Sequence, residues 1–277
     1  MKIGLLHPGA MGVAVAQTLV NGGHEVCWLS TDRSPATHHR AETAGLVEFN
    51  SLQALSESAD LIISVCPPHG AETLAQTVAD AGFGGTYIDA NAISPQRTKR
   101  IGKTLTANGI DYIDGGLIGG PPKERGRTWL YLSGEGAKSA VFLFSAGPME
   151  CEAISTEIGD ASALKMCFAA RTKTSNALLA NILAAADTLG VRAQLEKQWE
   201  VYDEGFTAKA HHQVKRVAHQ KAWRFAGELQ EIADTFDAIG LPDGFFTSAS
   251  DIFTKEAPFK EVEPPPTLEE VLASLNG

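Results

Sequence analysis

Positive charge is scarce in this 277-residue sequence, in which 33 aspartate and glutamate residues outnumber 23 lysine and arginine residues. The formal net charge of -10 argues against nucleic acid as a partner, because binding to phosphate backbones needs a basic surface. No apolar run reaches the ~20 residues that a membrane helix requires, and no signal peptide precedes the first apolar run. We therefore expect a cytoplasmic protein that binds neither nucleic acid nor membranes.

Cysteine is also rare, and the four residues Cys27, Cys66, Cys151 and Cys167 show no CxxC spacing. This usage favours reduced thiols in the core of a cytoplasmic protein over disulfides. No cluster of aspartate, glutamate and histidine has the spacing of a catalytic metal site, so we expect no metal. No GxSxG or Cys/His pattern supports nucleophilic hydrolysis.

Short apolar strands alternate with helices in the first half of the chain. The strand patterns lie at residues 3–6, 25–29, 61–65, 87–88, 112–113 and 129–132. Such alternation indicates a parallel sheet with helices on both faces, which is a doubly wound α/β fold of the Rossmann type. We expect this dinucleotide-binding domain to span residues 1–157.

The pattern changes to helix after about residue 158. Residues 162–189 contain neither proline nor glycine, and apolar side chains recur there at helical spacing. A helix of this length spans ~42 Å and suits a connection between two domains. Further helical patterns at 193–199 and 222–239, and a capping box at Thr267, predict an all-α substrate and dimerisation domain over 158–277.

A glycine turn joins the first strand to the first helix. Gly9 and Gly12 take the places of the second and third glycines of the GxGxxG fingerprint, which admit the pyrophosphate and the close packing of helix on strand. His7 replaces the first glycine, and we expect it to keep the turn because histidine tolerates a positive φ better than most residues. The helix N–H groups would face the phosphates, so the pyrophosphate site comprises Gly9, Ala10, Met11 and Gly12.

The end of the second strand favours NADP over NAD. An NAD enzyme carries an acidic residue there, which binds the ribose 2′-hydroxyl, whereas an NADP enzyme uses arginine and hydroxyl groups. Ser30 and Thr31 stand at the expected acidic place, and Arg33 would reach a 2′-phosphate. Asp32 is an acidic residue close to this place, so NAD is the alternative cofactor.

Five motifs in order resemble the β-hydroxyacid dehydrogenase and 6-phosphogluconate dehydrogenase superfamily. They are GAMG at 9–12 with the following GH at 23–24, DLIISVCPP at 60–68, DANAISP at 89–95, DGGLIGG at 114–120, and Gly159 followed by Lys165. The stretch EIADTFDAIGLP at 231–242 is similar to a poorly characterised subgroup with a phosphogluconate-dehydrogenase-like helical domain.

The resemblance implies an oxidoreductase that transfers a hydride between a nicotinamide cofactor and a small hydroxy acid or carbonyl compound. Lys165 would be the general acid/base. Cys66, Pro67 and Pro68 would line the cofactor, and Asn91 would lie in the nicotinamide pocket. Relatives of this architecture close their cleft with the helices of a partner, so the resemblance also implies a homodimer.

The implied substrate site departs from the family pattern. Ile118 stands in place of a substrate-binding serine, Ala169 in place of an asparagine, and Ala161 in place of the second motif glycine. This more apolar face makes an imine reductase one alternative, and a dinucleotide-binding protein without turnover is another. Lys123, Arg127, Arg171 and Lys173 are candidates for holding an anion. The implied substrate-binding residues are Ile118, Gly119, Gly120, Ala169 and Thr172.

Overall fold

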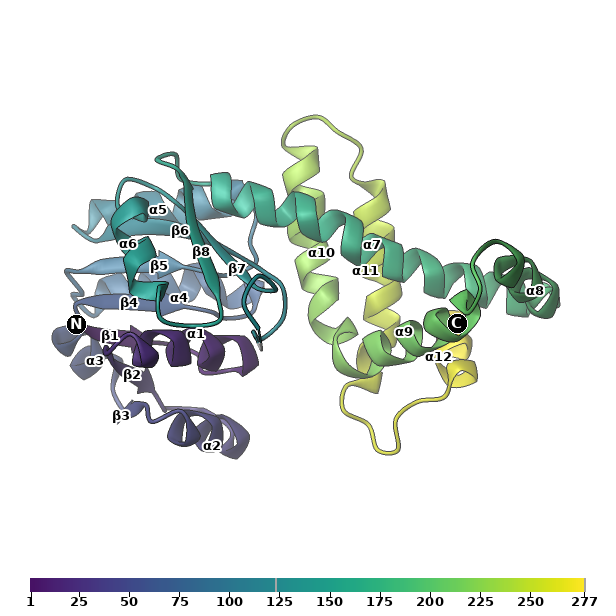
Figure 1. Cartoon of the computed structure of the whole chain (residues 1–277). Helices are drawn as coiled ribbons and strands as arrows, with labels where there is room; N and C mark the ends of the chain where they lie inside the picture. The colour runs from purple at the N-terminus through teal and green to yellow at the C-terminus, as the bar shows by residue number, and fades with distance from the viewer. Residues whose placement is uncertain (123, 277) are drawn as a thin grey trace. The chain divides into compact units, whose positions relative to one another are not determined.

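The computed structural model describes residues 1–122 and 124–276 (Figure 1). The chain divides into two compact units, Met1–Met166 and Cys167–Gly277. The division falls within the long helix α7 (Asp160–Thr188), so the first turns of this helix belong with the first unit. This places the division later than the boundary expected after residue 157. None of the described helices is both long and apolar enough to cross a membrane.

An eight-stranded sheet organises the first unit, in the order β3-β2-β1-β4-β5-β6-β7-β8. The doubly wound α/β fold is confirmed, but β6 and β7 pair antiparallel, whereas the sequence predicted a parallel sheet. The loop at residues 119–128 is too short for the crossover that parallel neighbours need. The strands are β1 (Lys2–Leu5), β2 (Glu25–Leu29), β3 (Val47–Phe49), β4 (Leu61–Ser64), β5 (Thr86–Asp89), β6 (Asp111–Ile118), β7 (Trp129–Ser133) and β8 (Glu150–Ser155).

Two hydrophobic clusters lie on opposite faces of this sheet. Ile63 belongs to one cluster and its neighbour Ile62 to the other, because successive strand side chains point to opposite faces. Helices cover both faces (Figure 1). Ser34 and Ser94 begin two of them as N-caps, each followed by a proline. The helices are α1 (Ala10–Asn21), α2 (Pro35–Thr43), α3 (Leu52–Ser58), α4 (Ala71–Asp80), α5 (Pro95–Ala107) and α6 (Ala137–Ala140), with the 3-10 turns η1 (Pro68–Gly70) and η2 (Val141–Phe144).

The second unit consists of helices, which confirms the predicted all-α region. Its core includes Leu183 of α7, Val214 of α9 and Leu272 of α12. The capping box at Thr267 forms as predicted, with Glu270 as its second member. The sequence patterns did not mark α9 or α11. After α7 come α8 (Arg192–Tyr202), α9 (Phe206–Gln220), α10 (Ala222–Asp237), α11 (Gly244–Glu256), the 3-10 turn η3 (Ala257–Phe259) and α12 (Leu268–Leu275).

The four cysteines are free thiols. Cys27 is buried in the core, Cys66 and Cys151 are half-buried, and Cys167 is exposed. The expectation of core thiols is therefore wrong for Cys167, which lies on the solvent side of α7.

Candidate active site

The turn between β1 and α1 is shaped by its glycines. A Cβ atom on Gly12 would collide with the carbonyl oxygen of His7, so only glycine lets α1 pack this closely on β1. A Cβ atom on Gly9 would meet nothing within 4 Å, so the space above this residue is open. Among the described non-glycine residues, only Asp32 and Glu261 have a positive φ. The turn therefore forms without the positive φ that we expected at His7.

Two cationic side chains lie against this turn. Arg33 donates from Nη2 to the carbonyl oxygen of Leu6 at 3.3 Å, and Arg40 donates from Nε to that of Pro8 at 3.3 Å. Burial and the charge of Arg33 lower the pKa of His7 to about 4, so this histidine is neutral at neutral pH. Nδ1 of His7 and Nε of Arg33 are buried atoms without a hydrogen-bond partner in the described structure. With the positive end of the α1 dipole, these groups favour an anion at the turn.

The hydroxyl groups expected at the adenosine ribose bind the backbone instead. Ser30 donates from Oγ to the carbonyl oxygen of Phe49 at 3.2 Å, and Thr31 donates from Oγ1 to that of Asn50 at 2.7 Å. Ser30 is buried, and Thr31 is exposed. Among the three residues expected at this place, Arg33 alone extends to the glycine turn in the described contacts.

Cys66 follows β4 at the point where the strand order reverses between β1 and β4, which is where open α/β sheets bind ligands. Its backbone N–H donates to Oδ1 of Asn91 at 2.5 Å, and Nδ2 of Asn91 donates to Oγ of Ser64 at 3.0 Å. The buried Asn91 amide thus joins the ends of β4 and β5. Burial raises the pKa of the Cys66 thiol to about 12, so the thiol stays protonated. Pro67 is exposed, and Pro68 is buried.

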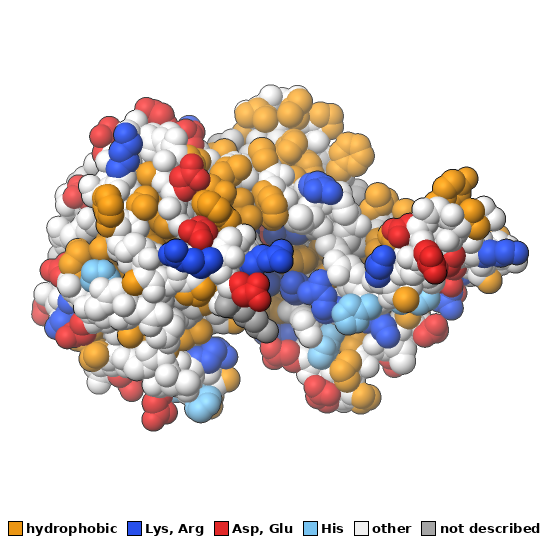
Figure 2. All heavy atoms as spheres, in the orientation of Figure 1, with side chains coloured by type: hydrophobic (Ala, Val, Ile, Leu, Met, Phe, Trp, Pro, Cys, Tyr) orange, Lys and Arg blue, Asp and Glu red, His pale blue; other side chains and the backbone are white. Residues whose placement is uncertain are grey.

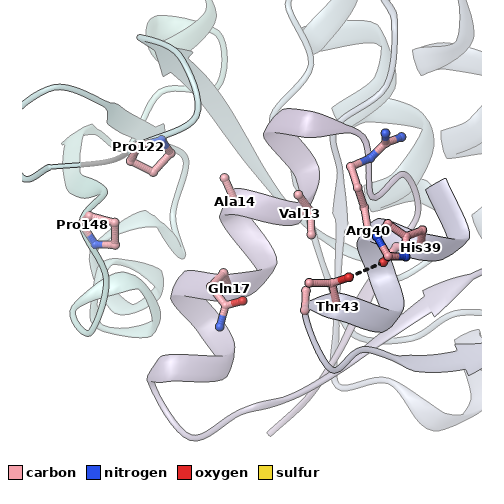
Figure 3. Close-up of a pocket in the computed structure, with 9 residues that line it drawn as sticks. Val13, Ala14, Gln17, His39, Arg40, Thr43, Pro122 and Pro148 are labelled. Carbon is pink, nitrogen blue, oxygen red and sulfur yellow. Dashed lines mark hydrogen bonds between the residues drawn. The ribbon is translucent and has the colours of Figure 1, made fainter. Parts of the chain in front are cut away.

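A cavity of about 440 Å³ lies on the flank of the first unit, between α1, α2 and two loops (Figure 3). Pro122 and Pro148 face Ala14 across it, and Thr43 donates to the carbonyl oxygen of His39 at 2.7 Å in its wall. Arg40 connects this cavity to the glycine turn. The lining is mainly apolar and comprises Val13, Ala14, Gln17, His39, Arg40, Thr43, Ala44, Pro122 and Pro148.

The Asp114 carboxylate of β6 holds the start of α7 on the sheet. Its Oδ2 accepts the backbone N–H groups of Gly159 at 3.1 Å and Ser162 at 3.0 Å, together with the Ser133 hydroxyl at 3.0 Å. Its Oδ1 accepts the Ser162 hydroxyl at 2.6 Å. The first N–H groups of a helix lack acceptors within the helix, and the Asp114 carboxylate is the acceptor for two N–H groups here. Burial raises the pKa of this carboxyl, while its donors oppose that rise.

Lys165 lies on α7 above the middle of β6. A Cβ atom on Gly116 would stand 3.2 Å from Cβ of Lys165 and 2.5 Å from the carbonyl oxygen of Ala161, so a glycine is needed at this crossing. Ala161 is fully buried, and Lys165 is half-buried. The described structure thus places Lys165 over the DGGLIGG motif.

A second buried carboxyl lies beside this network. Asp89 is the register partner of Asp114 on the adjacent strand. Its Oδ1 accepts the backbone N–H of Asn91 at 3.0 Å, and its Oδ2 is buried without a hydrogen-bond partner among the described residues. Burial raises the pKa of Asp89 to about 7, and the donated Asn91 N–H opposes the rise. The sequence did not predict the role of either carboxyl group, although Asp89 and Asp114 are the first residues of the DANAISP and DGGLIGG motifs.

The residues expected to bind substrate fall into two groups. Ile118 is half-buried at the end of β6, and Gly119 and Gly120 follow it as exposed loop residues. Ala169 and Thr172 lie on the part of α7 that belongs to the second unit; Ala169 is buried, and Thr172 is exposed.

Two further expectations concern charged groups. Of the anion candidates, Lys123 lies outside the described residues, whereas Arg127 and Arg171 are exposed and Lys173 is buried. Across residues 1–122 and 124–276, no group of three or more His, Cys, Asp or Glu side chains could hold a metal ion.

Comparison with known families identifies the first unit. Residues 2–142 match the model described as the NAD binding domain of 6-phosphogluconate dehydrogenase. The chain belongs to this family. The resemblance drawn from the five motifs is thereby confirmed. Residues 186–255 of this 6-phosphogluconate dehydrogenase relative match a second model, described as a domain of unknown function (DUF1932).

Curated relatives share part of the chain. An uncharacterized 28.5 kDa protein of Methanothermus fervidus is 26% identical over 195 residues, which cover 70% of this chain and 74% of that protein. The mitochondrial 3-hydroxyisobutyrate dehydrogenase of Drosophila melanogaster is 27% identical over 154 residues. That alignment covers 54% of this chain and 43% of the enzyme, so the chain aligns with less than half of this dehydrogenase.

Solved structures share the fold over nearly the whole chain. The 3-hydroxyisobutyrate dehydrogenase of Mycobacterium tuberculosis, solved with L-serine, has a TM-score of 0.72 at 20% identity and covers 100% of this chain and 99% of its own. A reductive aminase of Aspergillus terreus, in complex with NADPH and ethyl levulinate, has a TM-score of 0.56 at 16% identity and covers 98% of each chain. This family member therefore shares its fold with that 3-hydroxyisobutyrate dehydrogenase and that reductive aminase.

Proposed function

We propose that the protein is an NADP-preferring oxidoreductase that transfers a hydride between the nicotinamide and a small hydroxy acid or carbonyl compound. The observation that carries this proposal is the position of Lys165 over Gly116, in a chain of a dinucleotide-binding family. The hydroxyacid dehydrogenases among its relatives support this chemistry.

The glycine turn fits a dinucleotide. The space above Gly9 is open, so a pyrophosphate can approach the backbone there. Met11 and Gly12 continue the first turn of α1, whose N–H groups face the same end of the helix. The unpartnered Nε of Arg33 has the chemistry to donate a hydrogen bond to a phosphate oxygen.

The preference for NADP rests on Arg33 and Arg40. Both guanidinium groups lie at the glycine turn, beside the end of β2, where the adenosine ribose binds in this fold. Because the hydroxyl groups of Ser30 and Thr31 are bonded to backbone carbonyls, the arginines would provide the charge that holds a 2′-phosphate. The bound NADPH of the Aspergillus neighbour supports this choice.

The proposed chemistry needs one proton donor and acceptor. A bound nicotinamide would supply or accept the hydride. Lys165 would donate a proton to the substrate carbonyl oxygen during reduction and remove it during oxidation, a contribution of about 10²–10⁴-fold to the rate. Asp114 and Ser133 would act as positioning residues, because they hold the start of the helix that carries Lys165.

The first experiment is a fluorescence titration with NADPH and, separately, with NADH. We expect micromolar binding of NADPH and much weaker binding of NADH. A panel of hydroxy acids and carbonyl compounds would follow, with Lys165→Ala as the variant and Lys138→Ala as a control on another helix of the first unit. Absence of binding to either dinucleotide would refute the proposal. Equal turnover by the Lys165→Ala and Lys138→Ala variants would show that Lys165 is not the general acid/base.

An imine reductase is the second candidate, and Ile118 and Ala169 favour it because they replace polar residues of the family pattern. Retained reduction of cyclic imines by the Lys165→Ala variant, with ketone reduction lost, would select this candidate. A third candidate is a dinucleotide-binding protein without turnover, which predicts binding of NADPH and no absorbance change with any substrate in the panel.

We also propose a cytoplasmic homodimer. Exposed apolar side chains recur along α7. Others gather where α10 connects to α11, at the top of Figure 2. Such surface is typical of a protein–protein interface. The side chains of α7 are Leu164, Phe168, Leu178, Ile182 and Leu189, and those of the connection and the start of α11 are Ile239, Leu241 and Phe245. Light scattering at several protein concentrations would test the dimer, and a monomer throughout would exclude it.

A further inference from the structure

Cationic side chains gather on three helices of the second unit, although the whole chain has a net charge of -10. Lys173 is buried on α7, Arg216 is half-buried on α9, and Arg224 is exposed on α10. Lys221 is half-buried where α9 meets α10. We refer to these four residues as the cation cluster.

Lys173 and Arg224 meet at one aromatic ring. The Lys173 ammonium lies 4.8 Å from the centre of the Phe225 ring, and the Arg224 guanidinium carbon lies 5.6 Å from it. Lys173 also forms an ion pair with Glu228, with 2.8 Å between Nζ and Oε2. The ring contacts both cations and the carboxylate pairs with Lys173, which limits the mobility of these side chains.

Arg216 is held in place by a chain of amide groups. Its Nη2 donates to Oε1 of Gln213 at 2.8 Å, and Nε2 of Gln213 donates to Oδ1 of Asn176 at 2.5 Å. Nδ2 of Asn176 in turn donates to the carbonyl oxygen of Thr172 at 2.6 Å. The guanidinium of Arg216 is therefore positioned from α7, and its remaining N–H groups can serve a ligand.

Positive charges surround Lys221, and the end of its helix does not compensate them. Lys221 is the N-cap of α10, and no acidic residue occupies the first turn of this helix. Cations there oppose the helix dipole, whose positive end favours negative charge. Burial lowers the pKa of Lys221, and so do the charges of Arg216, Arg224 and Lys173, while Glu228 opposes the shift. The positive charges of Arg216, Arg224 and Lys173 thus act on Lys221.

We propose that the cation cluster binds the carboxylate or phosphate group of a small organic anion. Planar guanidinium groups form paired hydrogen bonds with both kinds of oxyanion, and an anion would relieve the mutual repulsion of the cations. All four residues of the cation cluster belong to the second unit.

The test uses the whole protein without dinucleotide, with inorganic phosphate and malonate as probes at constant ionic strength. Calorimetry gives the dissociation constant for each probe. We expect about tenfold weaker binding in Arg216→Gln and in Arg224→Gln, because each variant loses a charge-assisted hydrogen bond. The matched control is Lys215→Gln, an exposed cation on α9 next to Arg216, which should bind as the wild type does.

Glu228→Gln provides the opposite arm of the test. Removal of this carboxylate takes a negative charge out of the cation cluster, so binding of the anion should become tighter, whereas a purely structural cluster would not gain affinity. Equal affinities in all four variants, or no binding of either probe to the wild type, would overturn the inference. An NADPH titration of the same samples separates this result from the proposed function, because the proposed dinucleotide site consists of residues of the first unit.

Discussion

Removal of the Asp114 side chain should destabilise the first unit through the start of α7. In Asp114→Ala, the backbone N–H groups of Gly159 and Ser162 lose their acceptor in a buried place. Each such loss costs about 1–3 kcal/mol, so the free energy of unfolding should fall by about 3 kcal/mol or more. The Ser162 hydroxyl retains a partner in Thr98, at 2.9 Å, and adds little to this loss.

Asp114→Asn is the matched contrast, because its shape is the same. Its amide oxygen can take the place of Oδ2 and accept both N–H groups, while Nδ2 donates to the Ser162 hydroxyl. We therefore expect a loss of about 1 kcal/mol, the difference between a charged and a neutral acceptor. Urea unfolding followed by circular dichroism at pH 7 measures both variants. If Asp114→Ala unfolds within about 0.5 kcal/mol of the wild type, the carboxylate does not anchor α7.

Three further changes test other parts of the structure. Burial raises the pKa of Glu256 to about 8, so between its ordinary pKa of 4.5 and pH 8 the folded state holds a proton that the unfolded state releases. The free energy of unfolding should therefore fall by about 1.4 kcal/mol for each pH unit by which the pH rises in this range. Urea unfolding from pH 5 to pH 8 should show that Glu256→Gln lacks this part of the pH dependence. Parallel plots of stability against pH for the variant and the wild type would contradict this. Gly116→Ala should lower the free energy of unfolding by about 1–3 kcal/mol, because the new Cβ would displace the backbone of Ala161. This variant should also lower kcat more than it lowers the affinity for NADPH. An unchanged kcat would show that the packing of α7 on β6 at this point does not affect catalysis. Arg33→Ala should weaken NADPH binding about tenfold or more and NADH binding much less, as measured by fluorescence titration, since a charge-assisted hydrogen bond to the 2′-phosphate is lost; equal losses would assign Arg33 to the pyrophosphate.

Local sequence patterns predicted the features that depend on residues close together in the chain. The long helix was expected over 162–189 and spans Asp160–Thr188, because an uninterrupted run of helix formers is visible in one window. Gly12 was identified because its steric role depends on a turn of a few residues. The sequence patterns did not predict α9 or α11. Helix α9 is rich in histidine and lysine, and α11 begins with glycine and two aromatic residues.

Long-range partners could not be predicted in the same way. Asp114 opens a quoted motif, yet its acceptor role depends on Gly159 and Ser162, which are 45 and 48 residues away in sequence. The cation cluster likewise joins residues of three helices, and Lys173 was only one of four candidate anion ligands in the sequence. The antiparallel pairing of β6 and β7 follows from the short loop at residues 119–128. The strand patterns did not define the ends of these two strands closely enough to give the length of this loop.

The anchoring of α7 by β6 has a consequence for the way in which this chain can be recombined with its relatives. A chimera joined after residue 157 would take the helix start from another protein and leave the Asp114 carboxylate without Gly159 and Ser162. A junction after Met166 keeps the carboxylate, its donors and Lys165 within one parent. Exchange of C-terminal regions should therefore succeed at the second junction and yield insoluble protein at the first.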